Sequence, residues 1–423
     1  MAVDLRQVVA GILTVTMFVM LGNMIKREHF DSVGDAFLDE EAESEFNAGK
    51  IFDKTLASFG KNSIGPWIDD DADLKPCWGT SSLYDVDQSN GFITFSLTNG
   101  PEYHVSQVAD AVVVARYLGA TLILPDIRGS TAGDTVKFEE IYDTDKFIRS
   151  LSGVVKVKEE LPAHVSPSEM VVVKVPNRVT EDYISEQVEP LYKKNGNIRL
   201  ATYFPTVNMR KFSSAVKSNS DSLSCLGMFG TLNLKQEISE VADYIIERLK
   251  ALSRVSGSRF VAVDIKVEML ESKSCHEGGS SVTKSCFTPQ EIAVFLRKVG
   301  FNKDTVIYLT QSSWVDNLDV LRDIFPRTYT KESLMSASKK SIYLETQNSE
   351  FEKAIDFNIC SRSDVFVPAI SGLFYANVVG QRIAKGKTEV LVPASIPGAS
   401  AQVTSHLSPY ISKKSHVAYT CYC

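Results

Sequence analysis

The stretch GFITFSLTNGPEYHVSQVADAVVVARYLGATLILP, residues 91 to 125, decides the fold class of this chain. Its run GFITFSL predicts a strand, TNGPEYH a polar turn, VSQVADAVVVARYLG an amphipathic helix, and ATLILP a second, buried strand. Two strands joined through a helix run parallel, which is typical of layered α/β proteins. Ligands of such sheets bind where loops leave the carboxyl ends of the strands. The TNGPEYH turn is therefore a candidate site.

The same alternation continues along the chain in two rounds. MVVVKVP and IRLATYF predict further strands of the first round, and the helical segment LKQEISEVADYIIERLKALSR separates it from the second. The second round contains the strand-like runs RFVAVDIKVE, TVIYLT, DVFVPA and TEVLVPA. Between them, TPQEIAVFLRKVG predicts a helix that Thr288 caps and whose capping box Glu291 completes. We expect two Rossmann-like domains facing a cleft, residues 76–230 and 231–423, which is the GT-B arrangement of many glycosyltransferases.

The N-terminal segment predicts attachment to a membrane. Residues 8–25 (VVAGILTVTMFVMLGNMI) carry no charge and have the length of a short membrane helix. A cleaved signal peptide is the alternative, but no small-residue cleavage site follows the apolar run, which favours an uncleaved signal anchor after a tail at 1–7. Positive charges lie on both sides of the helix, so they leave its orientation open. Residues 26–75 are acidic and unpatterned, which predicts a stalk, and the aspartates at 69–73 fit a solvated linker better than a metal site.

Composition excludes some functions. The 423 residues carry a net charge of −7, which argues against a nucleic-acid partner because binding to phosphates needs a surplus of Lys and Arg. Seven cysteines are too few for a disulfide scaffold and leave at least one unpaired. Cys275 and Cys286 flank a loop that a disulfide can span, and His276 lacks the second ligand pair that a zinc site needs. We expect no metal site.

Two segments of the second half offer candidate ligand-binding residues. In SRSDVFVPAISGLFYANVVG a buried strand runs into a helix that starts near Ser371 and Gly372, where free amides suit a diphosphate, although the pair also fits a plain helix cap. Asp364 precedes that strand and is a candidate for hydrogen bonds to a ribose or a base. In VAVDIKVE, Asp264, Lys266 and Glu268 alternate on one strand face, so they either meet solvent or point at a ligand. Lys266 is the candidate for a phosphate.

The turn in the first half offers candidates for acid–base work. Asn99 and Gly100 lie at its start, and Glu102, Tyr103 and His104 follow. A carboxylate and an imidazole at a site can each act as a general base. Taken alone, the pattern favours a plain Gly/Pro turn with solvated polar side chains.

Three segments together resemble a known family. TNGPEYHVSQVADAVVVARYLGATLILPDI, RFVAVDIKVE and SRSDVFVPAISGLFYANVVGQR resemble, in order and spacing, signature regions of the plant protein O-fucosyltransferase-like glycosyltransferases. Within that family the whole chain, N-terminal anchor included, is similar to the mannan-synthesis-related group. The resemblance implies a GDP-sugar donor, inverting and metal-independent chemistry, and a type II Golgi membrane protein with its catalytic part in the lumen. It places the acceptor on the first domain and the nucleotide sugar on the second.

The resemblance transfers unevenly to individual residues. Asp264 and Lys266 stand where the family has an H-x-R pair whose arginine binds the donor diphosphate, and the G-G-L-N-Q-x-R pattern is altered around Asn99 and Gly100. The donor region keeps Asp364, Ser371, Gly372 and Arg382. The resemblance therefore predicts a transferase in mannan or glucomannan synthesis that acts on a polysaccharide acceptor, with Glu102 or His104 as base. The alternatives are a non-catalytic partner of a mannan synthase and, less favoured, a protein O-fucosyltransferase.

Overall fold

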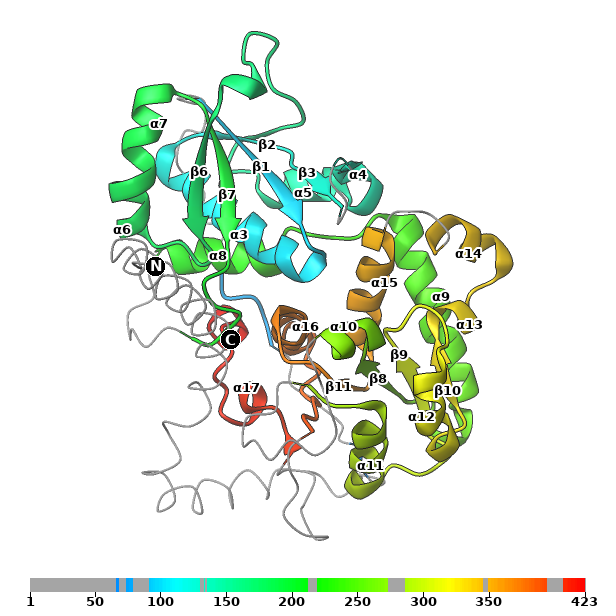
Figure 1. The fold of residues 1–423 in the computed structure, drawn as a ribbon. Helices are drawn as coiled ribbons and strands as arrows, with labels where there is room; N and C mark the ends of the chain where they lie inside the picture. The colour runs from blue at the N-terminus through cyan, green and yellow to red at the C-terminus, as the bar shows by residue number, and fades with distance from the viewer. Residues whose placement is uncertain are drawn as a thin grey trace, which may run out of the picture.

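The computed structural model describes residues 66–67, 74–78, 91–129, 133, 135–211, 219–272, 286–344, 349–393 and 406–422 (Figure 1). The predicted anchor at 8–25, the aspartates at 69–73, and Cys275 and His276 lie outside these residues. Among the helices that the structure describes, none is both long and apolar enough to cross a membrane.

The first half is built on a largely parallel sheet, as the sequence predicts. Its five parallel strands follow the order β5-β2-β1-β7-β6, and a β3–β4 pair extends the sheet where β3 runs beside the end of β1. The strands are β1 (Phe92–Thr98), β2 (Thr121–Ile123), β3 (Asp126–Arg128), β4 (Thr135–Lys137), β5 (Val157–Lys158), β6 (Val171–Pro176) and β7 (Ile198–Tyr203). The helices around them are α3 (Pro101–Leu118), α4 (Phe138–Ile141), α5 (Thr144–Ser150), α6 (Glu181–Tyr183), α7 (Glu189–Asn195) and α8 (Asn219–Phe229).

The start of α3 corrects one prediction. Pro101 takes the first helical position, where its missing N–H costs nothing, and Gly100 caps the helix with a φ of 105° that favours glycine. Glu102 and His104 therefore lie in the first turn of a helix and not in a polar loop. The helix ends at Gly119 in the left-handed conformation.

The second half contains a four-stranded parallel sheet in the order β10-β9-β8-β11. Its strands are β8 (Phe260–Asp264), β9 (Val306–Leu309), β10 (Thr328–Thr330) and β11 (Val365–Pro368). The helices are α9 (Gln236–Leu252), α10 (Val267–Ser272), α11 (Pro289–Val299), α12 (Asp319–Ile324), α13 (Lys331–Leu334), α14 (Ala337–Tyr343), α15 (Ser349–Arg362) and α16 (Leu373–Ala384). The predicted capping box at Thr288 and Glu291 is confirmed.

Two predicted strands of this half differ in the structure. The strand in RFVAVDIKVE ends at Asp264, and α10 begins at Val267, so Lys266 and Glu268 do not share a strand face with Asp264. TEVLVPA forms only isolated bridges, in which Val390 pairs with Phe366 and Leu391 with Leu407. Both segments have the apolar pattern of a strand, but their backbone groups do not form the continuous hydrogen-bond ladder of one.

One hydrophobic core runs through both halves. It contains strand residues of the first sheet together with apolar side chains of α3, α8, α9, α15 and α16. In Figure 1, α16 and α15 lie between α3 and the second sheet, and α3 contacts both helices. A separate core covers the other side of the second sheet, where Val261 and Val263 face α11 and α12.

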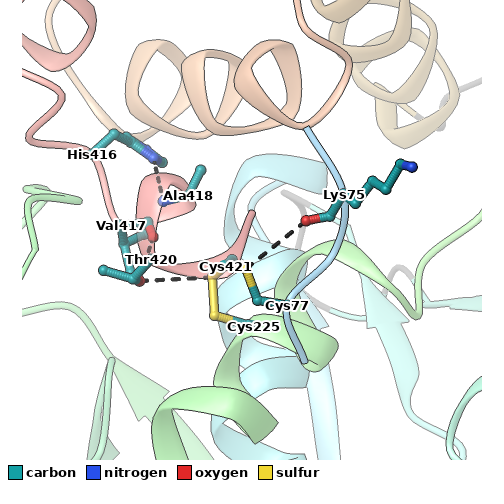
Figure 2. The surroundings of a disulfide bond; sticks show 8 residues. All are labelled: Lys75, Cys77, Cys225, His416, Val417, Ala418, Thr420 and Cys421. Carbon is teal, nitrogen blue, oxygen red and sulfur yellow. Dashed lines mark hydrogen bonds between the residues drawn. A yellow bond between two sulfur atoms is a disulfide. The ribbon is translucent and has the colours of Figure 1, made fainter. Parts of the chain in front are cut away.

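The end of the chain returns to the first half. A disulfide joins Cys225 of α8 to Cys421 of α18 (Ala418–Cys421), and Figure 2 shows this pair beside Cys77. The backbone N–H of Cys77 donates to the carbonyl of Cys421 at 2.8 Å. Cys77 and Cys286 are also disulfide-bonded, whereas Cys360 is a buried free thiol. The predicted pairing of Cys286 with Cys275 stays a prediction, because Cys275 lies outside the described residues.

Candidate functional site

The two halves meet where α3 of the first half packs against α15 and α16 of the second, and we call this place the junction. The first turn of α3 contributes the carboxylate of Glu102 to it. Asn99 has a φ of 67°, a conformation that non-glycine residues rarely adopt, and Gly100 follows with a φ of 105°. These two residues turn the chain sharply from β1 into α3. A Cβ on Gly100 would approach the Oε2 of Glu102 to 2.7 Å and the Cδ of Lys353 to 3.0 Å, so glycine keeps this turn close to α15.

The carboxylate of Glu102 has two properties of a general base, a buried oxygen atom without a hydrogen-bond partner and a raised pKa. Its Oε2 is buried and accepts no hydrogen bond from the described residues. Burial raises the pKa of Glu102 to about 7, against the lowering effect of a backbone hydrogen bond and of the nearby Lys266 and Lys353. Glu102 can therefore gain or lose a proton near neutral pH.

The carboxyl end of β8 brings Asp264 and Lys266 to the same junction. The Oδ1 of Asp264 accepts a hydrogen bond from the Oγ1 of Thr310 at 3.0 Å. The next backbone N–H groups leave the sheet, since Ile265 donates to the Thr310 hydroxyl at 3.0 Å and Val267 to the Oε1 of Gln311 at 2.9 Å. These side-chain acceptors end the strand and hold the turn that carries Lys266.

Lys266 is half-buried among carboxylates. Its Nζ lies 3.9 Å from the Oδ2 of Asp356 on α15. Burial alone would lower the pKa of Lys266, but the carboxylates of Asp356, Asp264 and Glu102 outweigh it, and the pKa is raised. Lys266 therefore keeps its positive charge.

Several residues at this junction were not predicted from the sequence. They lie on α15, on α13 and after β9, and comprise Thr310, Gln311, Lys331, Glu350, Glu352, Lys353 and Asp356. Two signals point to members of this set. Thr310 and Gln311 directly follow a buried strand, and Asp356 interrupts the buried side of α15 next to Ile355.

His104 has a different environment from Glu102. Its side chain is completely buried, its Nδ1 lies 2.7 Å from the hydroxyl of Tyr142, and its Nε2 lies 3.8 Å from the Oε2 of Glu350. Burial, assisted by the charge of Lys353, lowers the pKa of His104 to about 3, so the ring is neutral. Of the two predicted bases, Glu102 is the one whose position suits a substrate.

The start of α16 lies beside the same junction. β11 pairs with β8 so that the N–H of Ala369 donates to the carbonyl of Asp264 at 3.0 Å. Gly372 then caps α16 in an extended conformation, and a Cβ there would meet no atom within 4 Å. One helical turn further on, the Nδ2 of Asn377 donates to the carbonyl of Glu102 at 2.8 Å. Ser371 and Gly372 thus lie along the chain between Ala369, which bonds to Asp264, and Asn377, which bonds to Glu102.

Two predicted donor-binding residues lie elsewhere. Asp364 precedes β11, at the opposite end of the sheet, where it accepts from the N–H of Phe260 at 3.0 Å and lies 3.7 Å from the Nζ of Lys387. Arg382 is completely buried and donates to the carbonyls of Cys360, Ser363, Asp364 and Glu389 and to the hydroxyl of Ser363, at 2.7 to 3.1 Å. These contacts tie loops of the second half together, and a role of Asp364 and Arg382 in donor binding stays a prediction.

The part of the chain that the structure describes contains no group of three or more His, Cys, Asp or Glu side chains arranged to hold a metal ion. The carboxylates of the junction are instead paired with ammonium groups, as in Lys353–Glu350 at 2.7 Å. The site is therefore an assembly of carboxylates, lysines and helix amides.

Comparison with known proteins assigns the chain to a family. A family model described as GDP-fucose protein O-fucosyltransferase matches residues 94–385, a range that contains nearly all of both sheets. The chain belongs to this family of glycosyltransferases.

The chain is similar over its whole length to plant proteins named for mannan synthesis. It is 56% identical to MANNAN SYNTHESIS-RELATED 2 of Arabidopsis thaliana and 47% identical to MANNAN SYNTHESIS-RELATED of Trigonella foenum-graecum, with 100% of each chain covered. Among solved structures, POFUT1 in complex with GDP-fucose aligns with a TM-score of 0.43 and 12% identity, covering 74% of this chain and 100% of that one.

Proposed function

We propose that the protein is a Golgi glycosyltransferase that uses a GDP-sugar in mannan or glucomannan synthesis. In this proposal it is a single-pass type II membrane protein whose two halves lie in the lumen. The observation that carries the proposal is the buried Oε2 of Glu102, whose pKa is about 7, within electrostatic reach of Lys266. The family supports the GDP-sugar donor, and the names of the relatives support mannan synthesis. The Cys225–Cys421 disulfide supports an oxidising compartment.

The chemistry follows from the positions of these groups. A hydroxyl group of the acceptor attacks the anomeric carbon while the bond from that carbon to the diphosphate breaks, which inverts the anomeric configuration. Glu102 takes the proton of the hydroxyl group. Lys266 and the backbone amides at the start of α16 stabilise the negative charge on the departing GDP. These groups supply the positive charge that a metal ion supplies in other transferases, so we propose metal-independent transfer.

One observation favours an accessory role as the second candidate. Among the described residues, the carboxylates at the junction outnumber the ammonium groups, so the balance of charge opposes an anionic diphosphate. The carboxylates are Glu102, Asp264, Glu350, Glu352 and Asp356, and the ammonium groups are Lys266, Lys331 and Lys353. In that case the protein would assist a mannan synthase without transferring sugar. Protein O-fucosylation has less support, since Asp264 and Lys266 replace the H-x-R pair.

Substitution of Lys266 separates the two candidates. Lys266→Ala should abolish transfer because it removes the cation at the leaving group, whereas Lys266→Arg should keep or raise transfer because it restores a two-pronged donor. The measurement is mannan and glucomannan content in plant cells whose own copy is replaced by each variant at matched protein level. Lys303→Ala, at an exposed loop position, is the control. Full polymer content with Lys266→Ala would rule out the catalytic candidate and leave the accessory one.

A further inference from the structure

Lys331, at the start of α13, lies behind the site and has an unusual environment. Its ammonium group is completely buried and lies 3.0 Å from the Oδ2 of Asp356 and 3.5 Å from the Oε2 of Glu352. It also donates to the carbonyl of Thr310 at 2.8 Å and to the hydroxyl of Ser312 at 3.3 Å. Burying this charge carries a desolvation penalty, and removing it would leave its carboxylate partners buried without a counter-ion.

Lys331 and Lys266 share one oxygen atom. Lys331 lies 3.0 Å and Lys266 3.9 Å from the same Oδ2 of Asp356, and the other oxygen of Asp356 accepts from the hydroxyl of Tyr308 at 2.7 Å. Lys331 is therefore the closer counter-ion of Asp356, and Lys266 is held only loosely. Glu352 is occupied by Lys331 and by the hydroxyl of Ser312.

We propose that Lys331 is a positioning residue that neutralises Asp356 and Glu352 and so leaves the ammonium group of Lys266 free for the donor diphosphate. The proposal deepens the proposed function and rests on it for the identity of the ligand. Without Lys331, Asp356 would have only Lys266 as a cation, and the two would close to a direct pair. The diphosphate would then lose its partner and meet one more uncompensated carboxylate.

A double substitution distinguishes this role from support of the fold. Lys331→Met removes the charge and keeps most of the side-chain volume, and Lys331→Met/Asp356→Asn removes the opposing charge as well. If Lys331 acts through its charge, Asp356→Asn should restore the Lys266 reactivity and the GDP affinity that Lys331→Met lowers. If Lys331 only supports the fold, the second buried substitution should lower both quantities further.

The first readout needs no ligand. The rate at which the amine of Lys266 reacts with a small acylating reagent is measured in the full-length protein by peptide mass spectrometry, with Lys303→Met as control. Lys331→Met should slow the reaction about tenfold, because an unshared Asp356 holds Lys266 as an ammonium ion, and the double variant should recover the wild-type rate to within about threefold. An unchanged rate in Lys331→Met, or no recovery in the double variant, overturns the proposal.

The second readout is the dissociation constant of GDP, measured by calorimetry on the same proteins. We expect it to rise about tenfold in Lys331→Met and to return in the double variant. If GDP binds equally well to wild type and Lys331→Met, the proposal fails although the proposed function stands. If wild type does not bind GDP at all, the proposed function fails, and the acylation rates still decide whether Lys331 keeps Lys266 free.

Discussion

At the scale of a single residue, the proposed reaction depends on the ionisation of Glu102. The carboxylate accepts a proton only when it is ionised, so turnover should rise with pH through the pKa of about 7. The raised pKa also means that the folded protein holds this proton where the unfolded chain has released it. The stability of the fold should therefore fall as the pH rises from the ordinary value of 4.5 to about 7.

Glu102→Gln tests both effects. It should lower turnover of the GDP-sugar by about 10²- to 10⁴-fold and remove this part of the pH dependence of stability. The control is Glu237→Gln, at the same position in the first turn of α9 but exposed. Turnover that stays within a few-fold of wild type in Glu102→Gln would assign the base to another group.

We expect Arg382 to stabilise the fold and not to act in the reaction, because its hydrogen bonds go to other groups of the protein. Arg382→Met should remove the Arg382 donor from four carbonyl groups and one hydroxyl, of which the carbonyls of Cys360 and Glu389 keep a second donor, and should cost about 3 kcal/mol of unfolding free energy. The GDP affinity of the folded fraction should be unchanged. Denaturant unfolding together with calorimetry checks this, with the exposed Arg254→Met as reference. A stable variant that has lost GDP affinity would return Arg382 to the donor site.

At the scale of elements, the sequence predicted the alternation of strands and helices well because apolar runs of four to seven residues mark buried strands. It also singled out Glu102, Asp264 and Lys266 as candidates, but it placed Asp264 and Lys266 on a strand face and Glu102 in a separate turn, so it did not predict that the three would meet. It was wrong beyond Asp264, where Ile265 and Val267 keep the pattern of a strand while Thr310 and Gln311 take their N–H groups. Side chains more than 40 residues away thus accept hydrogen bonds that a neighbouring strand would otherwise accept, and the sequence around Asp264 does not reveal this.

The same limit explains the residues that were missed or misplaced. Lys331 and Asp356 lie 25 positions apart and meet only because α13 and α15 pack behind β9. Asp364 and Arg382 lie in the segment whose resemblance to the family suggested a donor site, yet their hydrogen bonds join parts of the fold. A sequence pattern does not separate these two roles, whereas burial and hydrogen bonding do.

The proposed binding of the donor depends most directly on the start of α16. Gly372→Ala and Gly372→Val should fold normally, since the extended backbone accepts any residue and a Cβ meets no atom within 4 Å. If the diphosphate sits on the amides of this helix, GDP affinity should fall with the size of the new side chain. Thermal melting and calorimetry across the series provide the check. Unchanged affinity in a folded Gly372→Val protein would place the diphosphate elsewhere.

At the scale of the whole molecule, the Cys225–Cys421 disulfide closes a loop with a sequence separation of 196 residues. The chain-entropy relation gives about 5 kcal/mol for a loop of this length, so Cys225→Ala/Cys421→Ala should be strongly destabilised. Cys360→Ala removes a buried thiol that closes no loop and is the matched control. The measurement is the midpoint of unfolding without reductant. Equal midpoints for the two variants would show that the crosslink adds nothing.

The core that α3 shares with α15 and α16 has a consequence for how ligands come and go. Many enzymes built from two α/β lobes admit their substrates by swinging the lobes apart about a hinge. Here such a swing would expose the packed apolar faces of three helices to water, at about 25 cal/mol for each Å² uncovered. In the proposed function, a nucleotide sugar would then enter, and GDP would leave, while the two halves remain in contact. On that proposal we expect the lifetime of the bound state to depend on small local rearrangements around Glu102 and Lys266 and not on a motion of whole domains.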